Sequence, residues 1–210
     1  MENKILLPLD GTESVEEILL YVTSITPCEA TGITLLNVIP DKDARVSGDE
    51  HSGEIYDGLA KAGWTVSRQT RMGDPVEEVV KFAILLPATM LLMSTHGRSG
   101  LERVREGSVT EQVLKQSPCP VFILHSTRAE PADRRTEKLF RRILVPLDGT
   151  ETSAAILDCV ERFARTHDSE VILFHDEMEG DSPEYNRAVV REVLQDRSVK
   201  LANTGLKVSL

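Results

Sequence analysis

The sequence is poor in cysteine and in long apolar runs. Only three of its 210 residues are cysteines, and no two of them form a C-x-x-C pair, so we expect neither a disulfide framework nor a zinc site. No stretch approaches the roughly 20 consecutive apolar residues that a membrane-spanning helix requires. Residues 1–4 lead directly into a strand pattern, so we expect no signal peptide and a cytoplasmic protein with reduced thiols.

Basic residues are also in the minority. The chain has 24 lysines and arginines against 34 aspartates and glutamates, which gives a formal net charge of −10. Such an acidic balance favours solubility and argues against non-specific binding to nucleic acid or to a membrane surface. The hydrophobic fraction of 40% suits one large or two small globular domains.

An internal repeat divides the chain. Its paired segments are Lys4–Glu13 with Arg142–Glu151, Ile33–Asn37 with Val171–His175, and Gly63–Ser67 with Gly205–Ser209. A period of this length indicates tandem domains rather than a solenoid of short repeats. We therefore predict a first domain at residues 1–126, a polar linker at residues 127–140 and an incomplete second domain at residues 141–210.

The first copy alternates between short apolar runs, typical of buried parallel strands, and segments of helical character. Strands are expected at residues 4–9, 32–39, 64–71, 89–94 and 121–124, and helices at residues 13–26, 54–62, 75–85 and 108–116, with a polar loop at residues 41–53. This alternation predicts an α/β fold, a doubly wound five-stranded parallel sheet in the order 3-2-1-4-5, with helices on both faces.

The second copy contains no counterpart of the fourth strand, the glycine-containing loop or the fifth strand of the first copy. In the predicted strand order the first strand is central, so the backbone edge of its counterpart is expected to be exposed. We expect this half-domain to be marginal by itself, so that either another chain or surface covers it or the sequence is a fragment.

The stretch between the fourth strand and the following helix has the features of an anion site. It starts at the carboxyl end of a buried strand, where ligands of open α/β sheets bind. Glycines such as Gly97 and Gly107 allow the backbone to approach a ligand closely. The amides of residues 107–109 would face an anion at the helix N-terminus, aided by the hydroxyls of Ser108 and Thr110. Arginines in the loop could add charge toward phosphates: Arg98, Arg103 and Arg105.

At these residues the sequence resembles the universal stress protein family, whose ATP-binding members carry the pattern G-x2-G-x9-G-[ST]. The corresponding residues here are Ser94, Gly97, Gly107 and Ser108, with serine in place of the first glycine. Three further segments look like the family: Ile5–Gly11, Val109–Leu114 and Ser117–Val121. The resemblance covers residues 1–125, and the front part of the fold again at residues 142–210.

The resemblance implies a binding site for ATP, ADP or AMP in the first domain. Asp10 would hydrogen-bond the ribose or the adenine edge, with Pro8 and Leu9 beside it, and Val38 would contact the base. The phosphates would lie against the loop and helix start, which comprise Ser94, Gly97, Arg98, Gly107, Ser108, Val109 and Thr110. A Mg²⁺ or Mn²⁺ ion would be carried by the phosphates, because no protein carboxylate cluster for it is evident. The resemblance also implies a homodimer through the fifth strand, Val121–Leu124.

Each of these residues also suits a structural role. Asp10 could cap the first helix, Gly107 and Ser108 could end a loop and begin a helix, and the arginines could form a solvated face. The side chain of Ser94 lies where the family's glycine allows the backbone its closest approach. The second copy is not expected to bind nucleotide, because it lacks the phosphate loop and has Asp176 where the first copy has Val38.

Three functions are compatible with these residues. The first is an ATP-binding stress-response or regulatory module with at most slow hydrolysis. The second is a weak ATPase or nucleotidyl transferase, against which the chain has no G-x-x-x-x-G-K-[ST] loop and no evident general base, nucleophile or metal-binding carboxylate pair. The third is a dimeric interaction module of the same fold that has lost nucleotide binding.

Overall fold

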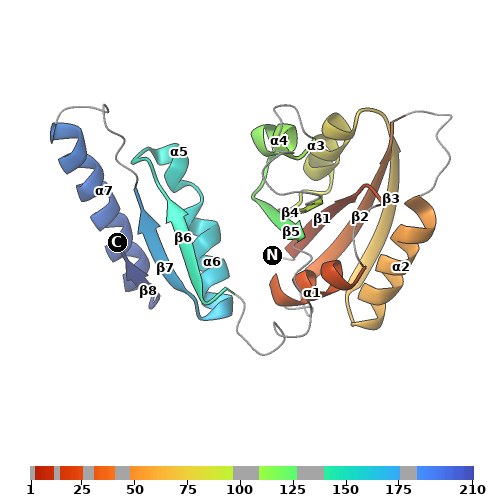
Figure 1. Ribbon diagram of the computed structural model, residues 1–210, viewed down its shortest axis with the longest axis horizontal. Helices are drawn as coiled ribbons and strands as arrows, with labels where there is room; N and C mark the ends of the chain where they lie inside the picture. Colours follow the sequence, from red (N-terminus) through yellow and green to blue (C-terminus); the bar gives the residue numbers. More distant parts are fainter. Residues whose placement is uncertain are drawn as a thin grey trace. The chain divides into compact units, whose positions relative to one another are not determined.

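The structure is a computed structural model that describes residues 3–11, 15–25, 31–40, 48–96, 109–126, 140–175 and 184–210. It contains two compact units, Met1–Ala129 and Glu130–Leu210, whose boundary falls within the predicted linker (Figure 1). The first unit comprises β1 (Asn3–Leu9), α1 (Val15–Ile25), β2 (Thr31–Ile39), α2 (Gly48–Lys61), β3 (Thr65–Met72), α3 (Pro75–Leu85), β4 (Met90–His96), α4 (Val109–Gln116) and β5 (Val121–Ser126). The second unit comprises β6 (Arg142–Pro146), α5 (Glu151–Ala154), α6 (Leu157–His167), β7 (Glu170–Phe174), α7 (Glu184–Asn203) and β8 (Lys207–Ser209).

The first unit is built on a five-stranded sheet in the order β3-β2-β1-β4-β5, and every pair of neighbouring strands is parallel. This confirms the predicted fold class. The central strand β1 has consecutive apolar residues because both of its faces are covered: Ile5, Leu6 and Leu7 are all buried. Its register is fixed on both sides, with Leu6 opposite Thr34 of β2 and opposite Leu91 of β4.

Two helix layers sandwich this sheet. On one face, Leu6 and Leu36 share a core with apolar residues of α3 and α4, namely Val76, Val79, Phe82, Ala83 and Val113. Alternation along the strands directs Ile5, Leu7, Ile33 and Leu35 to the opposite face, where α1 and α2 lie (Figure 1). The helix α3 begins as the sequence predicts: the Asp74 side chain accepts a hydrogen bond of 3.0 Å from the Glu77 amide, and Pro75 occupies the first turn.

Most element boundaries lie within two residues of the prediction, and the start of α2 differs most. The helix α2 begins at Gly48, so it includes residues 48–53 of the expected polar loop. A contact with the sheet holds this added part of the helix in place: Ser52 is buried and accepts a hydrogen bond of 2.9 Å from the Arg68 guanidinium of β3. The strand β4 continues to His96, since β5 continues beside it and pairs with residues 95 and 96 as well.

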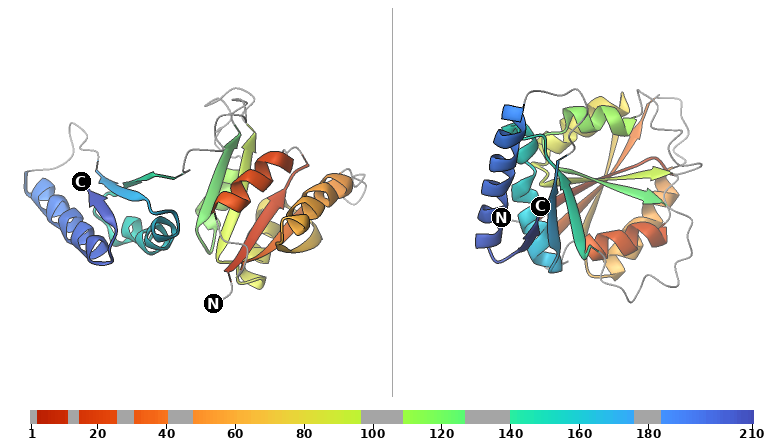
Figure 2. Two further views of the ribbon diagram at one scale, coloured as in Figure 1. Left: turned by 90° about the horizontal axis from the view of Figure 1, so that it is seen from below. Right: turned by 60° about the vertical axis from the view of Figure 1, so that its left-hand side comes forward.

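The second unit repeats the first three strands of this fold. Its parallel strands are in the order β6-β7-β8. Helices α6 and α7 lie on the same face of this sheet (Figure 2). They enclose a core of Val145, Leu147, Leu157, Val160, Ala164, Val171, Leu173, Leu194 and Leu201. Phe140, the last residue of the predicted linker, contributes to this unit, because its ring lies edge-on to that of Phe163 with centroids 5.0 Å apart.

Turn conformation also repeats between the units. Gly11 and its counterpart Gly149 have φ angles of +86° and +85°, a left-handed conformation that favours glycine. The repeat detected in the sequence is therefore a repeat of backbone geometry as well.

Two further features of the described residues concern the cysteines and the helices. Cys119 and Cys159 are half-buried thiols, and burial raises the pKa of the Cys159 thiol, which keeps it protonated. No helix in the described part of the chain is both long and apolar enough to cross a membrane.

Candidate functional site

The strand order of the first unit reverses direction at its central strand. From β1 the chain passes to β2 and β3 on one side, and then returns to β4 and β5 on the other. The helices that connect β1, β2 and β3 therefore cover one face of the sheet, and the helices that lead to β4 and β5 cover the other face (Figure 1). Such a reversal point, at the carboxyl ends of the strands, is where open α/β sheets bind ligands.

Five of the predicted site residues lie at this edge of the sheet. Pro8 and Leu9 are the last two residues of β1, Asp10 follows directly, and Val38 is the penultimate residue of β2. Ser94 lies in the second half of β4, and the β1–β4 register, continued from Leu6 opposite Leu91, sets it level with Leu9. Residues from three adjacent strands are thus brought together at one edge of the sheet.

These side chains face different directions. Leu9 is buried, Asp10 is exposed, and Pro8, Val38 and Ser94 are half-buried. Val38 packs against the core beneath α3 and α4. The edge therefore offers one exposed carboxylate beside partly accessible apolar surface, a combination that suits a flat base with a polar sugar attached.

The start of α4 lies at the same edge of the sheet as these residues. A helix that joins two parallel strands runs against their direction, so its first residues, Val109 and Thr110, lie at the carboxyl edge of the sheet. Val113 anchors the helix in the core that also holds Leu6 and Leu36. The helix N-terminus, with its partial positive charge, is thereby held at the same edge as Asp10.

Four predicted residues lie outside the described part of the chain: Gly97, Arg98, Gly107 and Ser108. The phosphate-binding part of the site therefore stays a prediction. Among the described residues no group of three histidine, cysteine, aspartate or glutamate side chains could hold a metal ion, so we assign no metal to protein ligands there.

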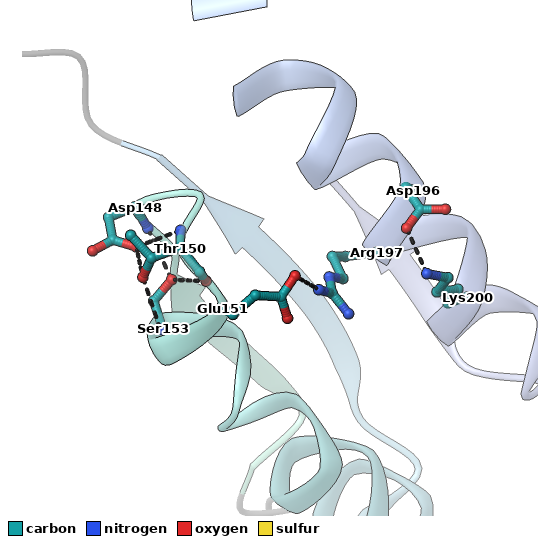
Figure 3. Close-up of polar contacts among 7 residues, drawn as sticks. All are labelled: Asp148, Thr150, Glu151, Ser153, Asp196, Arg197 and Lys200. Carbon is teal, nitrogen blue, oxygen red and sulfur yellow. Dashed lines mark hydrogen bonds and ion pairs between the residues drawn. The ribbon is translucent and has the colours of Figure 1, made fainter. Parts of the chain in front are cut away.

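The second unit shows what the repeated Asp-Gly-Thr-Glu turn does structurally (Figure 3). The Asp148 Oδ1 atom accepts hydrogen bonds from the Thr150 amide at 2.9 Å and from the Thr150 hydroxyl at 2.7 Å. Thr150 in turn caps α5 by accepting a bond of 3.1 Å from the Ser153 amide. Hydrogen bonds from Ser153 and Thr150 lower the pKa of Asp148 to about 2.

This geometry bears on the matching residue of the first unit. Asp10 stands in the same sequence context and precedes a glycine with the same φ angle. A turn-forming role of its carboxylate is therefore expected beside any ligand contact. The sequence is compatible with a ligand contact and with a structural role for Asp10. The hydrogen bonds of Asp148 indicate that the structural role is to accept hydrogen bonds from the backbone and side chain of the turn.

The Asp148→Asn variant tests this role through pH. Because the folded-state pKa is lowered to about 2 from 3.8, the ionised carboxylate stabilises the folded unit above pH 4, and this contribution is lost as the pH falls toward 2. We expect the variant to unfold at a lower temperature than the unchanged protein at pH 6, with the gap closing near pH 2. Circular dichroism melts at both pH values measure it, and a gap that is equal at both would contradict the assignment.

Other contacts close the strand ends of the second unit. His175 Nδ1 lies 2.8 Å from the Leu147 carbonyl oxygen, which bridges the ends of β7 and β6. Glu151 of α5 forms an ion pair of 2.6 Å with Arg197 of α7 (Figure 3). These contacts could not be predicted from the sequence, because the partners are 28 and 46 residues apart.

A cavity of about 370 Å³ lies in the second unit, against the carboxyl end of β7 and α7. Its lining is mainly apolar, with the cationic Arg191 and the polar His175 and Gln195 among its residues. No motif in the sequence indicated this cavity.

Comparison with known proteins extends the resemblance seen in the sequence. The sequence model of the universal stress protein family matches residues 1–125. The chain is similar to universal stress protein MJ0531 of Methanocaldococcus jannaschii, with 30% identity over 143 residues, which is 60% of this chain and 84% of that protein. It is also similar to universal stress protein MJ0577 of the same organism, with 28% identity over 154 residues, or 59% of this chain and 95% of that protein.

A solved structure extends the fold comparison to both units. The crystal structure of a universal stress protein from Archaeoglobus fulgidus aligns with 100% of this chain and 77% of its own chain, with a TM-score of 0.76 and 22% identity. At that identity the likeness establishes the fold alone.

Proposed function

Since the chain belongs to the universal stress protein family, we propose that its first unit binds ATP, or ADP or AMP, as a stress-response or regulatory module with at most slow hydrolysis. The observation that carries this proposal is the meeting of Asp10, Val38 and the start of α4 at one edge of the sheet. A nucleotide needs a polar contact for its ribose, an apolar contact for its base and an electropositive contact for its phosphates. The three elements supply these in that order.

Each part of the ligand then has its own residues. The adenosine end lies between the ends of β1 and β2, where Pro8, Leu9, Asp10 and Val38 contact it. The phosphates extend past Ser94 to the α4 N-terminus and meet Gly97, Arg98, Gly107, Ser108, Val109 and Thr110. A Mg²⁺ or Mn²⁺ ion travels with the phosphates. We place the protein in the cytoplasm, where adenine nucleotides are abundant.

Nucleotide content after purification tests this function. The protein is purified without added nucleotide and denatured, and the supernatant is analysed by ion-exchange chromatography. We expect ATP, ADP or AMP in the supernatant, and a rise in the melting temperature when ATP is added to nucleotide-free protein. Turnover above about 1 s⁻¹ would favour an enzyme instead. The absence of both bound nucleotide and thermal shift would favour an interaction module.

The edge strand β5 supports dimerisation as a second function of the same unit. It is the last strand of its sheet. Ile123 on this strand is 40% exposed, and Leu114 on the preceding helix α4 is 45% exposed. An edge strand with apolar side chains beside it favours pairing with another chain. We propose that two copies pair through Val121–Leu124.

The Ile123→Glu variant tests this interface. The added charge is expected to convert the dimer to a monomer, because removing an unpaired carboxylate from water at the centre of a small interface costs free energy. Light scattering coupled to size-exclusion chromatography measures the mass. Ile84→Glu is the matched control, since Ile84 is an exposed isoleucine of α3 in the same unit and its replacement is expected to leave the dimer intact. A monomeric unchanged protein would contradict the interface.

A further inference from the structure

Arg71, the penultimate residue of β3, lies in line with two residues of the proposed nucleotide site. In the sheet register Arg71 is opposite Val38 of β2. The β1–β2 register places Leu9 opposite Asn37, and its continuation by one residue sets Asp10 level with Val38. Asp10, Val38 and Arg71 therefore form one row across three adjacent strands at the carboxyl edge of the sheet. Because neighbouring strands are about 4.8 Å apart, the row spans roughly 10 Å.

The side chains of Val38 and Arg71 lie on the same face of the sheet. Val38 packs against the core that contains Phe82 of α3. The guanidinium carbon of Arg71 lies over the Phe82 ring, 5.0 Å from its centroid, which is the geometry of a cation–π contact. Phe82 is only 8% exposed, so its ring holds one side of the guanidinium in a fixed place beside Val38.

The hydrogen-bonding groups of Arg71 serve no contact within the part of the chain that the structure describes. Its guanidinium forms no ion pair and donates no hydrogen bond there, although the side chain is half-buried. Arg68 of the same strand differs, because it donates a hydrogen bond of 2.9 Å to Ser52. Arg71 thus presents a planar cation that is supported by an aromatic ring on one side and lies next to a predicted base contact.

The place of this guanidinium fits the far end of a purine base. In the function proposed above, on which this inference rests, the ribose lies at Asp10 and the base contacts Val38. A base that continues along the row points from Val38 toward Arg71. The two fused rings of a purine extend farther from the ribose than the single ring of a pyrimidine, so only a purine reaches Arg71. The flat face of a guanidinium is well suited to stacking on a base.

We propose that Arg71 is a nucleotide-binding residue that selects purine over pyrimidine nucleotides. Its guanidinium stacks on the six-membered ring of the purine and lies between that ring and Phe82. Phe82 is a positioning residue, because it holds the guanidinium in place without touching the ligand. A pyrimidine nucleotide keeps the contacts with Asp10, Val38 and the start of α4 but lacks the contact with Arg71.

The Arg71→Met variant tests this selection. Methionine keeps an unbranched side chain against Phe82 but has no planar cation, and circular dichroism melts verify that the variant is folded. Isothermal titration calorimetry of the nucleotide-free full chain gives Kd for ATP and for CTP, which have the same ribose and triphosphate. Loss of a positive charge would weaken both nucleotides equally, so the ratio of the two Kd values isolates the contact with the base.

Two further variants complete the experiment. Lys81→Met is the matched control, because it removes a positive charge from the exposed side of α3 in the same unit. Arg71→Lys keeps the charge and removes the planar face, so it tests the same contact even where methionine at this position disturbs the fold.

We expect the unchanged chain and Lys81→Met to bind ATP at least about tenfold more tightly than CTP, as a stacking contact would provide. In Arg71→Met this preference is expected to fall to about threefold or less, mainly through weaker binding of ATP, and Arg71→Lys is expected to lower it as well. A chain that binds ATP but keeps the same preference in both Arg71 variants would overturn this inference alone. Equal weakening of ATP and CTP in Arg71→Met would also overturn it, by identifying a contact with the phosphates. If the unchanged chain binds neither nucleotide, the inference and the proposed function are both wrong.

Discussion

The Gly107→Asp variant is expected to lose adenine-nucleotide binding. Residue 107 lies two positions before the start of α4 and belongs to the proposed phosphate contact, so an aspartate there adds a negative charge and side-chain bulk against the phosphates. The helix N-terminus attracts anions, and a carboxylate of the protein itself would compete for it. We expect Kd for ATP to rise by at least about 100-fold, equivalent to ~2.7 kcal/mol. Isothermal titration calorimetry of nucleotide-free protein measures the change.

The Gln116→Glu variant is the control for this experiment. It adds the same charge at the exposed C-terminal residue of α4, about 11 Å along the helix axis from its first residue. We expect ATP affinity to change by less than about threefold there, because exposed charges at this separation are largely screened at physiological ionic strength. A folded Gly107→Asp protein with unchanged affinity for ATP would show that the phosphates bind elsewhere.

The Leu6→Ala variant is expected to destabilise the first unit by about 2–5 kcal/mol, the usual cost of a cavity at a fully buried leucine. Leu6 is 0% exposed and lies in the central strand between two helix layers. The same substitution at its repeat counterpart, Leu144→Ala, is expected to cost less than about 1 kcal/mol in the second unit, because that side chain has few neighbours to lose. Identical residues at matching positions are thus expected to differ several-fold in their effect.

Urea unfolding separates these two effects. Trp64 is the only tryptophan in the sequence and is buried in the first unit, so its fluorescence follows that unit alone, while amide hydrogen exchange reports on the second. We expect the midpoint of the fluorescence transition to fall for Leu6→Ala and to stay unchanged for Leu144→Ala. An equal loss of stability, measured by fluorescence for Leu6→Ala and by hydrogen exchange for Leu144→Ala, would show that Leu144 is covered in solution.

The elements of the fold were predictable where apolar runs and turn residues agreed. Asp74-Pro75 marked the start of α3, and the runs in β1 and β4 marked strands that are covered on both faces. The start of α2 was not predictable, because what extends this helix through Ser52 is a hydrogen bond from Arg68, which lies 16 residues away on another strand. Long-range contacts of this kind leave no periodic signal in the local sequence.

For the candidate site, the sequence indicated the residues but not how the fold would bring them together. The motif located Asp10, Ser94 and the start of α4 separately along the chain, and the strand order then brought them to one edge. The hydrogen bonds of Asp148 with Thr150 show in addition that the repeated turn serves the backbone. A motif gives residue types and spacing, whereas the partner of a given oxygen atom depends on the folded geometry.

The sequence by itself determined the family, the repeat and the order of strands and helices, because these follow from local patterns and motifs along the chain. Only the tertiary structure decided which matching residues are buried. Leu6 and Leu144 occupy equivalent places in nearly identical segments, yet one is enclosed and the other is exposed. The physical reason is that burial depends on neighbouring elements: α3 and β4 cover Leu6, and no described element of the second unit covers Leu144 in the same way.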